Sequence, residues 1–246
     1  MLSIFKKTRT KSVDFSQLGV DMHSHLLPGI DDGSPDVQMS DLLIKGLLDL
    51  GYKKLITTPH IMADIYPNTP STINAAYEQL KKETQLSLVN FPVSPAGEYL
   101  LDDGFDEILK KAEPLLCISG NLVLVEFSFA APPVDFKEKL FQIQLAGYQP
   151  VLAHPERYIY WYGNKPVIDQ LKTAGCHFAV NLLSFTGYYG KPCVDLAQYF
   201  QKKNYINFLG TDLHHLRHLE MLQQAHSLMP IINQLLDKGQ LHNPKI

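Results

Sequence analysis

Short apolar segments alternate with amphipathic helical patterns along almost the whole chain, and this alternation restricts the possible folds more than any other feature. Strands are predicted at residues 19–22, 54–57, 91–96, 122–126, 150–153, 177–180 and 207–210. Helices are predicted at residues 36–50, 72–87, 135–146, 165–174, 194–203 and 216–237, with Ser71 as a candidate cap of the second. Repeated β–α alternation is typical of a mostly parallel sheet with helices outside it, so we predict an α/β fold.

Side chains that bind metal ions follow nearly every predicted strand. They are His23, His25, Asp32, His60, Glu98, Glu126, His154, Asp212 and His214. Because functional groups in such folds collect at the carboxyl ends of the strands, we expect these side chains to form a ring around one barrel mouth. Imidazoles and carboxylates hold Zn, Mn or Fe, and this set suffices for two or three ions. A multinuclear metallohydrolase is therefore the leading interpretation.

Two pairs and one acidic loop strengthen this interpretation. His23 and His25 lie two residues apart at a strand end, so both imidazoles are expected on one face, and Asp212 and His214 repeat the spacing. In the loop that follows His25, either Asp31 or Asp32 could return to the metal cluster, and we favour Asp32; an ordinary acidic turn is the alternative.

Two acids end apolar strands, and two arginines follow ligand-type histidines. Glu98 and Glu126 would be costly to bury unless a cation or a metal ion pairs with them. Arg157 and Arg217 each lie three residues past a ligand-type histidine, where a guanidinium could bind phosphate; a surface ion pair is the alternative. We assign no chemistry to the remaining histidines.

The bulk properties exclude several classes of protein. The formal net charge of −3 gives no basic field for nucleic acid. Three cysteines without CxxC spacing argue against a disulfide scaffold or a thiolate zinc site and favour the cytoplasm. No apolar run is long enough for an integral membrane segment. Residues 1–18 are predicted to be a basic extension, frayed or touching an anionic membrane surface, and residues 19–246 one metallohydrolase domain.

Several short motifs, taken together, resemble a known superfamily. They are Asp21-x-His23-x-His25, Pro28-Gly29-x-Asp31-Asp32-Gly33, Thr58-Pro59-His60, Gly97-Glu98-Tyr99, Glu126-Phe127-Ser128, His154-Pro155-Glu156-Arg157-Tyr158 and Thr211-Asp212-x-His214. From about residue 19 to residue 220, the chain resembles the polymerase-and-histidinol-phosphatase (PHP) superfamily. Within it, the chain is similar to the bacterial manganese-dependent protein-tyrosine phosphatases of the CpsB/CapC type, which belong to capsule and exopolysaccharide gene clusters.

This resemblance implies a distorted seven-stranded β/α barrel of PHP type that holds two or three ions, usually Mn²⁺, with Fe or Zn possible. The first implied ion takes His23, His25, Glu98 and Asp212; the second takes Glu98, Glu126 and His154; the third takes Asp32, His60 and His214. The implied substrate is the phosphotyrosine tail of a membrane-associated tyrosine autokinase. Arg157 best matches the phosphate-binding arginine, with Arg217 as the second candidate, and Tyr99, Tyr188 and Tyr189 could line the mouth or pack in the core.

The cysteines provide an independent check. A cysteine-dependent tyrosine phosphatase needs an arginine six positions after its cysteine, but Val123, Leu182 and Tyr199 follow Cys117, Cys176 and Cys193 at that spacing. Any phosphatase activity must therefore depend on metal. Three alternatives stay open: a PHP phosphatase for a small metabolite such as histidinol phosphate, a phosphoesterase or editing nuclease, and a metal-stabilised regulatory module without turnover. The sequence leaves the oligomeric state open.

Overall fold

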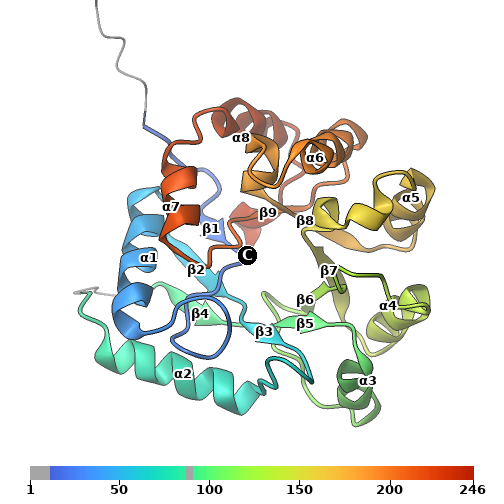
Figure 1. The fold of residues 1–246 in the computed structure, drawn as a ribbon, viewed down its shortest axis with the longest axis horizontal. Coiled ribbons are helices and arrows are strands. Elements are labelled where there is room, and N and C mark those ends of the chain that lie inside the picture. The colour runs from blue at the N-terminus through green and yellow to red at the C-terminus, as the bar shows by residue number, and fades with distance from the viewer. Residues whose placement is uncertain (1–11, 87–90) are drawn as a thin grey trace, which may run out of the picture.

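The computed structural model describes residues 12–86 and 91–246, and in it strands occupy the centre while helices surround them (Figure 1). The strands are β1 (Val20–Asp21), β2 (Lys54–Thr57), β3 (His60–Ile61), β4 (Val93–Pro95), β5 (Glu98–Leu100), β6 (Leu122–Glu126), β7 (Gln149–Ala153), β8 (His177–Asn181) and β9 (Phe208–Gly210). All pairings between them are parallel, in the orders β1-β2-β4 and β3-β5-β6-β7-β8-β9. The predicted α/β fold is confirmed.

Two of the strand positions are interrupted, which the sequence pattern did not predict. The second position breaks between β2 and β3 at Pro59, which has no N–H to donate to a neighbouring strand. The third breaks between β4 and β5 at Gly97, where an added Cβ would lie 2.6 Å from a methyl group of Ile61. Glu98 therefore begins β5 and does not end an apolar strand as expected. Because of these two breaks, β2 and β4 form one sheet with β1, whereas β3 and β5 belong to the other sheet, with β6 to β9.

The first and last strand positions meet and close the ring. The Asp212 N–H donates to the His23 carbonyl (2.8 Å), and the His25 N–H donates to the Leu213 carbonyl (2.9 Å). Ser24 and Leu213 form a parallel bridge at the same point. The chain is thus a distorted barrel with seven strand positions, in which two ligand motifs also form the seam.

Two hydrophobic clusters hold the barrel together. The inner cluster fills the barrel floor with side chains such as Met22, Leu124 and Phe208, all fully buried. The outer cluster packs helices onto the strands and includes Val13, Phe15 and Leu18. These three side chains precede residue 19, the predicted start of the metal-binding domain, and pack against it. The basic residues before position 12 lie outside the described part of the chain.

The helices agree with the sequence pattern in most places. They are α1 (Val37–Asp49), α2 (Pro70–Glu83), α3 (Asp103–Lys110), α4 (Phe136–Leu145), α5 (Lys165–Thr173), α6 (Lys191–Lys203), α7 (Leu216–Gln223) and α8 (Leu228–Asp237). The pattern missed α3, which Asp102 caps. The predicted cap Ser71 is wrong, because the Thr69 side chain accepts the capping hydrogen bond from the Thr72 N–H. No helix of residues 12–86 and 91–246 has the length and hydropathy to cross a membrane.

The predicted helix 216–237 is wrong as a single element. It is divided into α7 and α8, and Pro230 lies in the first turn of α8. A proline has no N–H, and the first turn of a helix is the place where none is needed.

One buried side chain near the end of the described chain bridges the barrel floor. Asn243 is fully buried; it accepts from the Leu209 N–H (2.9 Å) and donates to the Leu209 and Val20 carbonyls (2.7 and 3.1 Å). We expect Asn243→Ala to lower the free energy of unfolding by about 2–4 kcal/mol, because it leaves buried backbone groups without partners. Chemical denaturation would measure the loss. The matched control is Asn164→Ala, since that asparagine is exposed and its side chain makes no capping hydrogen bond; an equal loss in both variants would contradict the prediction.

Candidate metal centre

The nine ligand-type residues predicted from the sequence all reach the barrel mouth. They form four overlapping groups in which the possible ligand atoms lie within 4.8 Å of one another. The groups are His25, Asp32, His60 and His214; His23, His25 and Asp212; His23, Glu98 and His154; and His60, Glu98 and Glu126. Eight of the nine are buried or half-buried, and only Asp32 is exposed.

Glu98 lies at the middle of these groups. Its Oε2 is 3.2 Å from His23 Nε2, 3.4 Å from His25 Nε2 and 3.2 Å from His60 Nδ1. Its Oε1 is 3.2 Å from His154 Nε2. One fully buried carboxylate therefore contacts four imidazoles, which is the position a carboxylate needs in order to bridge two cations. The early start of β5 produces this position, because it places Glu98 opposite His60 of β3 in the strand register.

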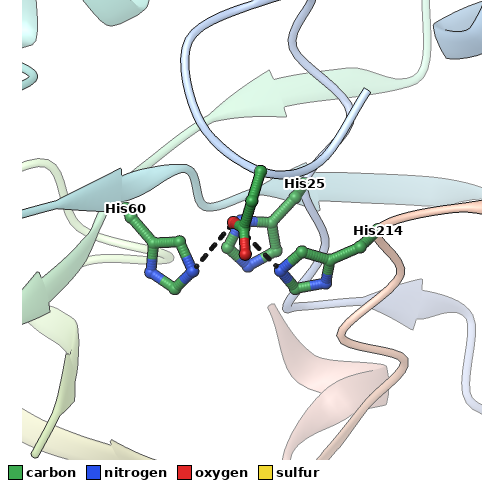
Figure 2. Close-up of side chains that lie close together, drawn as sticks. His25, His60 and His214 are labelled. Carbon is green, nitrogen blue, oxygen red and sulfur yellow. Dashed lines mark ion pairs between the residues drawn. The ribbon is translucent and has the colours of Figure 1, made fainter. Parts of the chain in front are cut away.

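The exposed side of the centre is formed by Asp32 and two imidazoles. Figure 2 shows His60 and His214 on either side of a carboxylate, with His25 close behind. Asp32 Oδ1 lies 3.4 Å from His60 Nε2 and 3.6 Å from His214 Nε2. Asp31 turns the other way, and its Oδ2 lies 2.8 Å from His25 Nδ1. Of the two neighbouring acids, Asp32 faces the centre, and Asp31 orients a ligand histidine from behind.

Several buried nitrogen and oxygen atoms of the centre are arranged for binding metal ions and do not form hydrogen bonds with one another. His60 Nδ1, Glu98 Oε2 and Glu126 Oε1 are buried and have no hydrogen-bond partner among the described residues. His60 Nδ1 nevertheless lies 2.8 Å from Glu126 Oε1. Two polar atoms that converge without hydrogen-bond geometry are arranged as two ligands of one ion would be. Burying these groups would be costly without a cation, and the nitrogen and oxygen donors suit Mn, Fe or Zn.

Two of the ligand-type residues have a strained backbone. His154 and Asp212 lie in the left-handed region, with φ of 35° and 50°. Such a conformation costs a non-glycine residue about 1–3 kcal/mol and persists where the surroundings enforce it. Here the His154 N–H donates to the Ala179 carbonyl (2.8 Å), and the Asp212 N–H donates across the barrel seam. The strain turns both side chains toward the centre.

The electrostatics keep the central carboxylates ionised. Burial alone would raise the pKa of Glu98, but the charges of His23 and His60 hold that pKa well below its usual range. Burial would likewise raise the pKa of Asp212, which the neighbouring histidines and Arg157 hold low. Burial and the charge of His25 lower the pKa of His214 to about 4, so this imidazole is neutral and can bind a cation.

Arg157 lies at the rim of the centre, and Arg217 does not. Arg157 Nη1 donates to Asp212 Oδ2 (2.6 Å), and the guanidinium lies 4.9 Å from the Phe129 ring and 4.2 Å from the Tyr189 ring. Arg157 lines a cavity of about 230 Å³ with Asp32, His60, Phe129, His154, Tyr189, Asp212, His214, His215 and His218. Arg217 is exposed, lies 5.9 Å from the Tyr188 ring and does not line this cavity.

The three tyrosines predicted at the mouth have different environments. Tyr99 is 1% exposed, packs edge-on against Phe105 and accepts a hydrogen bond from the Leu116 N–H (2.8 Å). The prediction that it lines the mouth is therefore wrong, because Tyr99 belongs to the core. Tyr189 lines the cavity, whereas Tyr188 does not, and its ring lies 4.9 Å from the Tyr189 ring.

Sequence reasoning missed several side chains of this site. Among them are His215 and His218, which line the cavity although no chemistry was assigned to them, and also Asn181 and Phe129. Asn181 Nδ2 lies 3.1 Å from Asp212 Oδ2 and 3.1 Å from the Tyr189 hydroxyl, so it supports both. The sequence did contain a signal for Asn181. It ends β8, and this is the one predicted strand after which no metal-ligand residue was expected. Phe129 gave no such signal, since a phenylalanine in a proline-containing loop has no periodic partner.

A barrel of parallel strands with a multinuclear donor set at its mouth defines a metal-dependent hydrolase of the α/β class. The chain belongs to the family described as "Capsular polysaccharide synthesis, CpsB/CapC", whose sequence model matches residues 19–230. The resemblance predicted from the motifs is confirmed, and the matched region extends ten residues further than expected.

Relatives and solved structures agree with this family. The chain is 28% identical over 198 residues to the tyrosine-protein phosphatase YwqE of Bacillus subtilis (strain 168), covering 80% of this chain and 78% of YwqE. It is 24% identical over 217 residues to the tyrosine-protein phosphatase CpsB of Streptococcus pneumoniae, covering 85% and 89%. It also superposes with a TM-score of 0.77 and 27% identity on a chain from the crystal structures of YwqE and CpsB from these species, described as unique metal-dependent tyrosine phosphatases. That superposition covers 87% of this chain and 86% of the other.

Proposed function

We propose that this protein is a metal-dependent tyrosine-protein phosphatase of capsular polysaccharide synthesis. The observation that carries the proposal is the convergence of nine metal-ligand-type side chains, five of which line one cavity together with Arg157. The similarity to YwqE and CpsB supports the reaction type. It disfavours the metabolite phosphatase, the nuclease and the module without turnover.

The proposed cofactor is a set of two or three Mn²⁺ ions, with Fe or Zn as substitutes that the same donors accept. In this proposal, as the family resemblance implies, His23, His25, Glu98 and Asp212 hold the first ion, Glu98, Glu126 and His154 the second, and Asp32, His60 and His214 the third. In addition, His25 lies near the third set, and Glu126 is grouped with His60 and Glu98. Ions bound there would activate a water molecule for attack on phosphorus and offset charge on the phosphoryl oxygens.

The protein side chains orient the phosphate. Arg157 directs its guanidinium into the cavity and can donate to phosphoryl oxygens with the N–H groups that Asp212 does not use. The rings of Phe129 and Tyr189 hold the guanidinium plane. A tyrosine leaving group has a pKa of about 10, so it departs without strong help from a general acid.

The proposed substrate is the phosphotyrosine tail of a membrane-associated tyrosine autokinase. A disordered tail can enter a cavity of this size where a folded partner would meet the rim. The cysteines take no part: Cys176 and Cys193 are buried, and burial raises the pKa of each thiol to about 12.

We expect purification without chelators to give about two or three ions per chain by elemental analysis.

In the presence of Mn²⁺, kcat/KM should be at least about tenfold higher for phosphotyrosine peptides than for phosphoserine peptides or histidinol phosphate, a difference of ~1.4 kcal/mol in transition-state binding. Replacement of all three cysteines should leave turnover intact. A tenfold preference for histidinol phosphate would instead support the metabolite phosphatase, and a folded cysteine-free variant without activity would point to thiolate chemistry.

A further inference from the structure

Phe129 is a large apolar side chain exposed inside an otherwise polar cavity. It follows β6 by three residues and is 45% exposed. Its ring stacks on the His154 ring at a centroid distance of 5.3 Å and an interplanar angle of 20°. Single exposed apolar residues are ordinary on protein surfaces, but this one lies beside a ligand-type histidine and the arginine at the rim.

Among residues 12–86 and 91–246, the aromatic carbocycles that line the cavity are Phe129 and Tyr189, and they differ in how much of each ring is left uncovered. Tyr189 contacts the Arg157 guanidinium (4.2 Å) and the Tyr188 ring (4.9 Å), and its hydroxyl is bonded to Asn181. The Phe129 ring contacts His154 and Arg157, and almost half of its side chain faces solvent. Of the aromatic side chains that line the cavity, Phe129 is therefore the more exposed one next to the groups proposed to hold phosphate.

We infer that Phe129 determines specificity for aryl phosphates by stacking against the phenyl ring of the substrate, an inference that rests on the proposed function. A phosphate bound at Arg157 places the first atoms of its ester group within reach of the Phe129 ring. An aromatic pair adds attraction beyond the burial of its surface, and a serine or glycerol ester has no ring to supply. The same ring contact also keeps Arg157 in place, so the experiment must separate the two roles.

Phosphonate inhibitors of the Mn²⁺-loaded enzyme separate them. Phenylphosphonate and methylphosphonate carry the same charged head and differ in the ring. We expect Phe129→Ala to weaken inhibition by phenylphosphonate about tenfold and to raise KM for phosphotyrosine peptides similarly, while inhibition by methylphosphonate changes less than about twofold. Phe129→Tyr, which retains a ring, should restore both values. The matched control is Phe141→Ala, because Phe141 is 53% exposed on α4 and does not line the cavity.

Equal weakening of both phosphonates in Phe129→Ala would overturn the inference, because it would mean that Phe129 acts through the arginine. Unchanged inhibition by both would overturn it as well. These results differ from failure of the proposed function, in which the unsubstituted enzyme with Mn²⁺ hydrolyses no aryl phosphate at all.

Discussion

Asp212→Ala is expected to reduce phosphatase activity by more than about 10³-fold while the barrel stays folded. Asp212 Oδ1 lies 3.4 Å from His23 Nε2 and 3.6 Å from His25 Nε2, and its Oδ2 accepts from Arg157. The alanine variant thus removes a negative ligand and the anchor of the arginine together. His23→Ala, which removes a ligand but leaves the anchor, should also abolish turnover.

Elemental analysis, circular dichroism and kinetics on the same preparation would test this expectation. Metal content should fall in both variants, and the thermal transition should remain cooperative, because the hydrophobic cores do not include these side chains. Asp195→Ala is the control, since Asp195 is an exposed helical residue that pairs only with Lys191 among the described residues. Full activity in Asp212→Ala would mean that the metal assignment is wrong.

Arg157→Ala is expected to lower kcat/KM by about 10²–10³-fold, the usual cost of removing one donor that stabilises transition-state charge. Arg157→Lys should recover only part of the loss, because an ammonium cannot make the paired contacts of a guanidinium or stack between the Phe129 and Tyr189 rings in the same way.

The comparison with Arg217→Ala decides between the two arginine candidates. Arg217 is exposed and outside the cavity lining, so its loss should be much smaller than that of Arg157. Metal content must be measured in each variant, because a drop in Arg157→Ala would assign the effect to a disturbed Asp212. A larger loss in Arg217→Ala would contradict the proposed role of Arg157.

The sequence predicted the barrel and the ligand-type residues that converge at its mouth because both obey local rules. Apolar segments of strand length recur with helical patterns between them, and the chemistry of a parallel barrel gathers where its strands end. The spacing of His23 and His25 needed only the two-residue period of a strand. These rules act within a few residues, so a sequence displays them directly.

Features that depend on tertiary contacts were not predictable in the same way. The burial of Tyr99 depends on α3, a short helix that the pattern missed, and the position of Glu98 depends on the break at Gly97. The role of Asn181 depends on Asp212, which lies 31 residues further along the chain. The role inferred for Phe129 depends on its contact with Arg157. Each of these involves a partner that no periodic pattern identifies.

The seam of the barrel has a consequence for the order in which the protein is made. His23 and His25 are synthesised early. Asp212 and His214, which complete their groups, lie on the other side of the seam, and Asp212 follows His23 by 189 residues. Chains emerge from the ribosome amino end first, and contacts between distant residues form late. A nascent chain therefore cannot assemble the complete centre before the last strand has left the ribosome. Binding of ions by the complete set of ligand-type residues must therefore follow the synthesis of β9 and the residues after it, and translation that stops before β9 yields a chain with an incomplete centre.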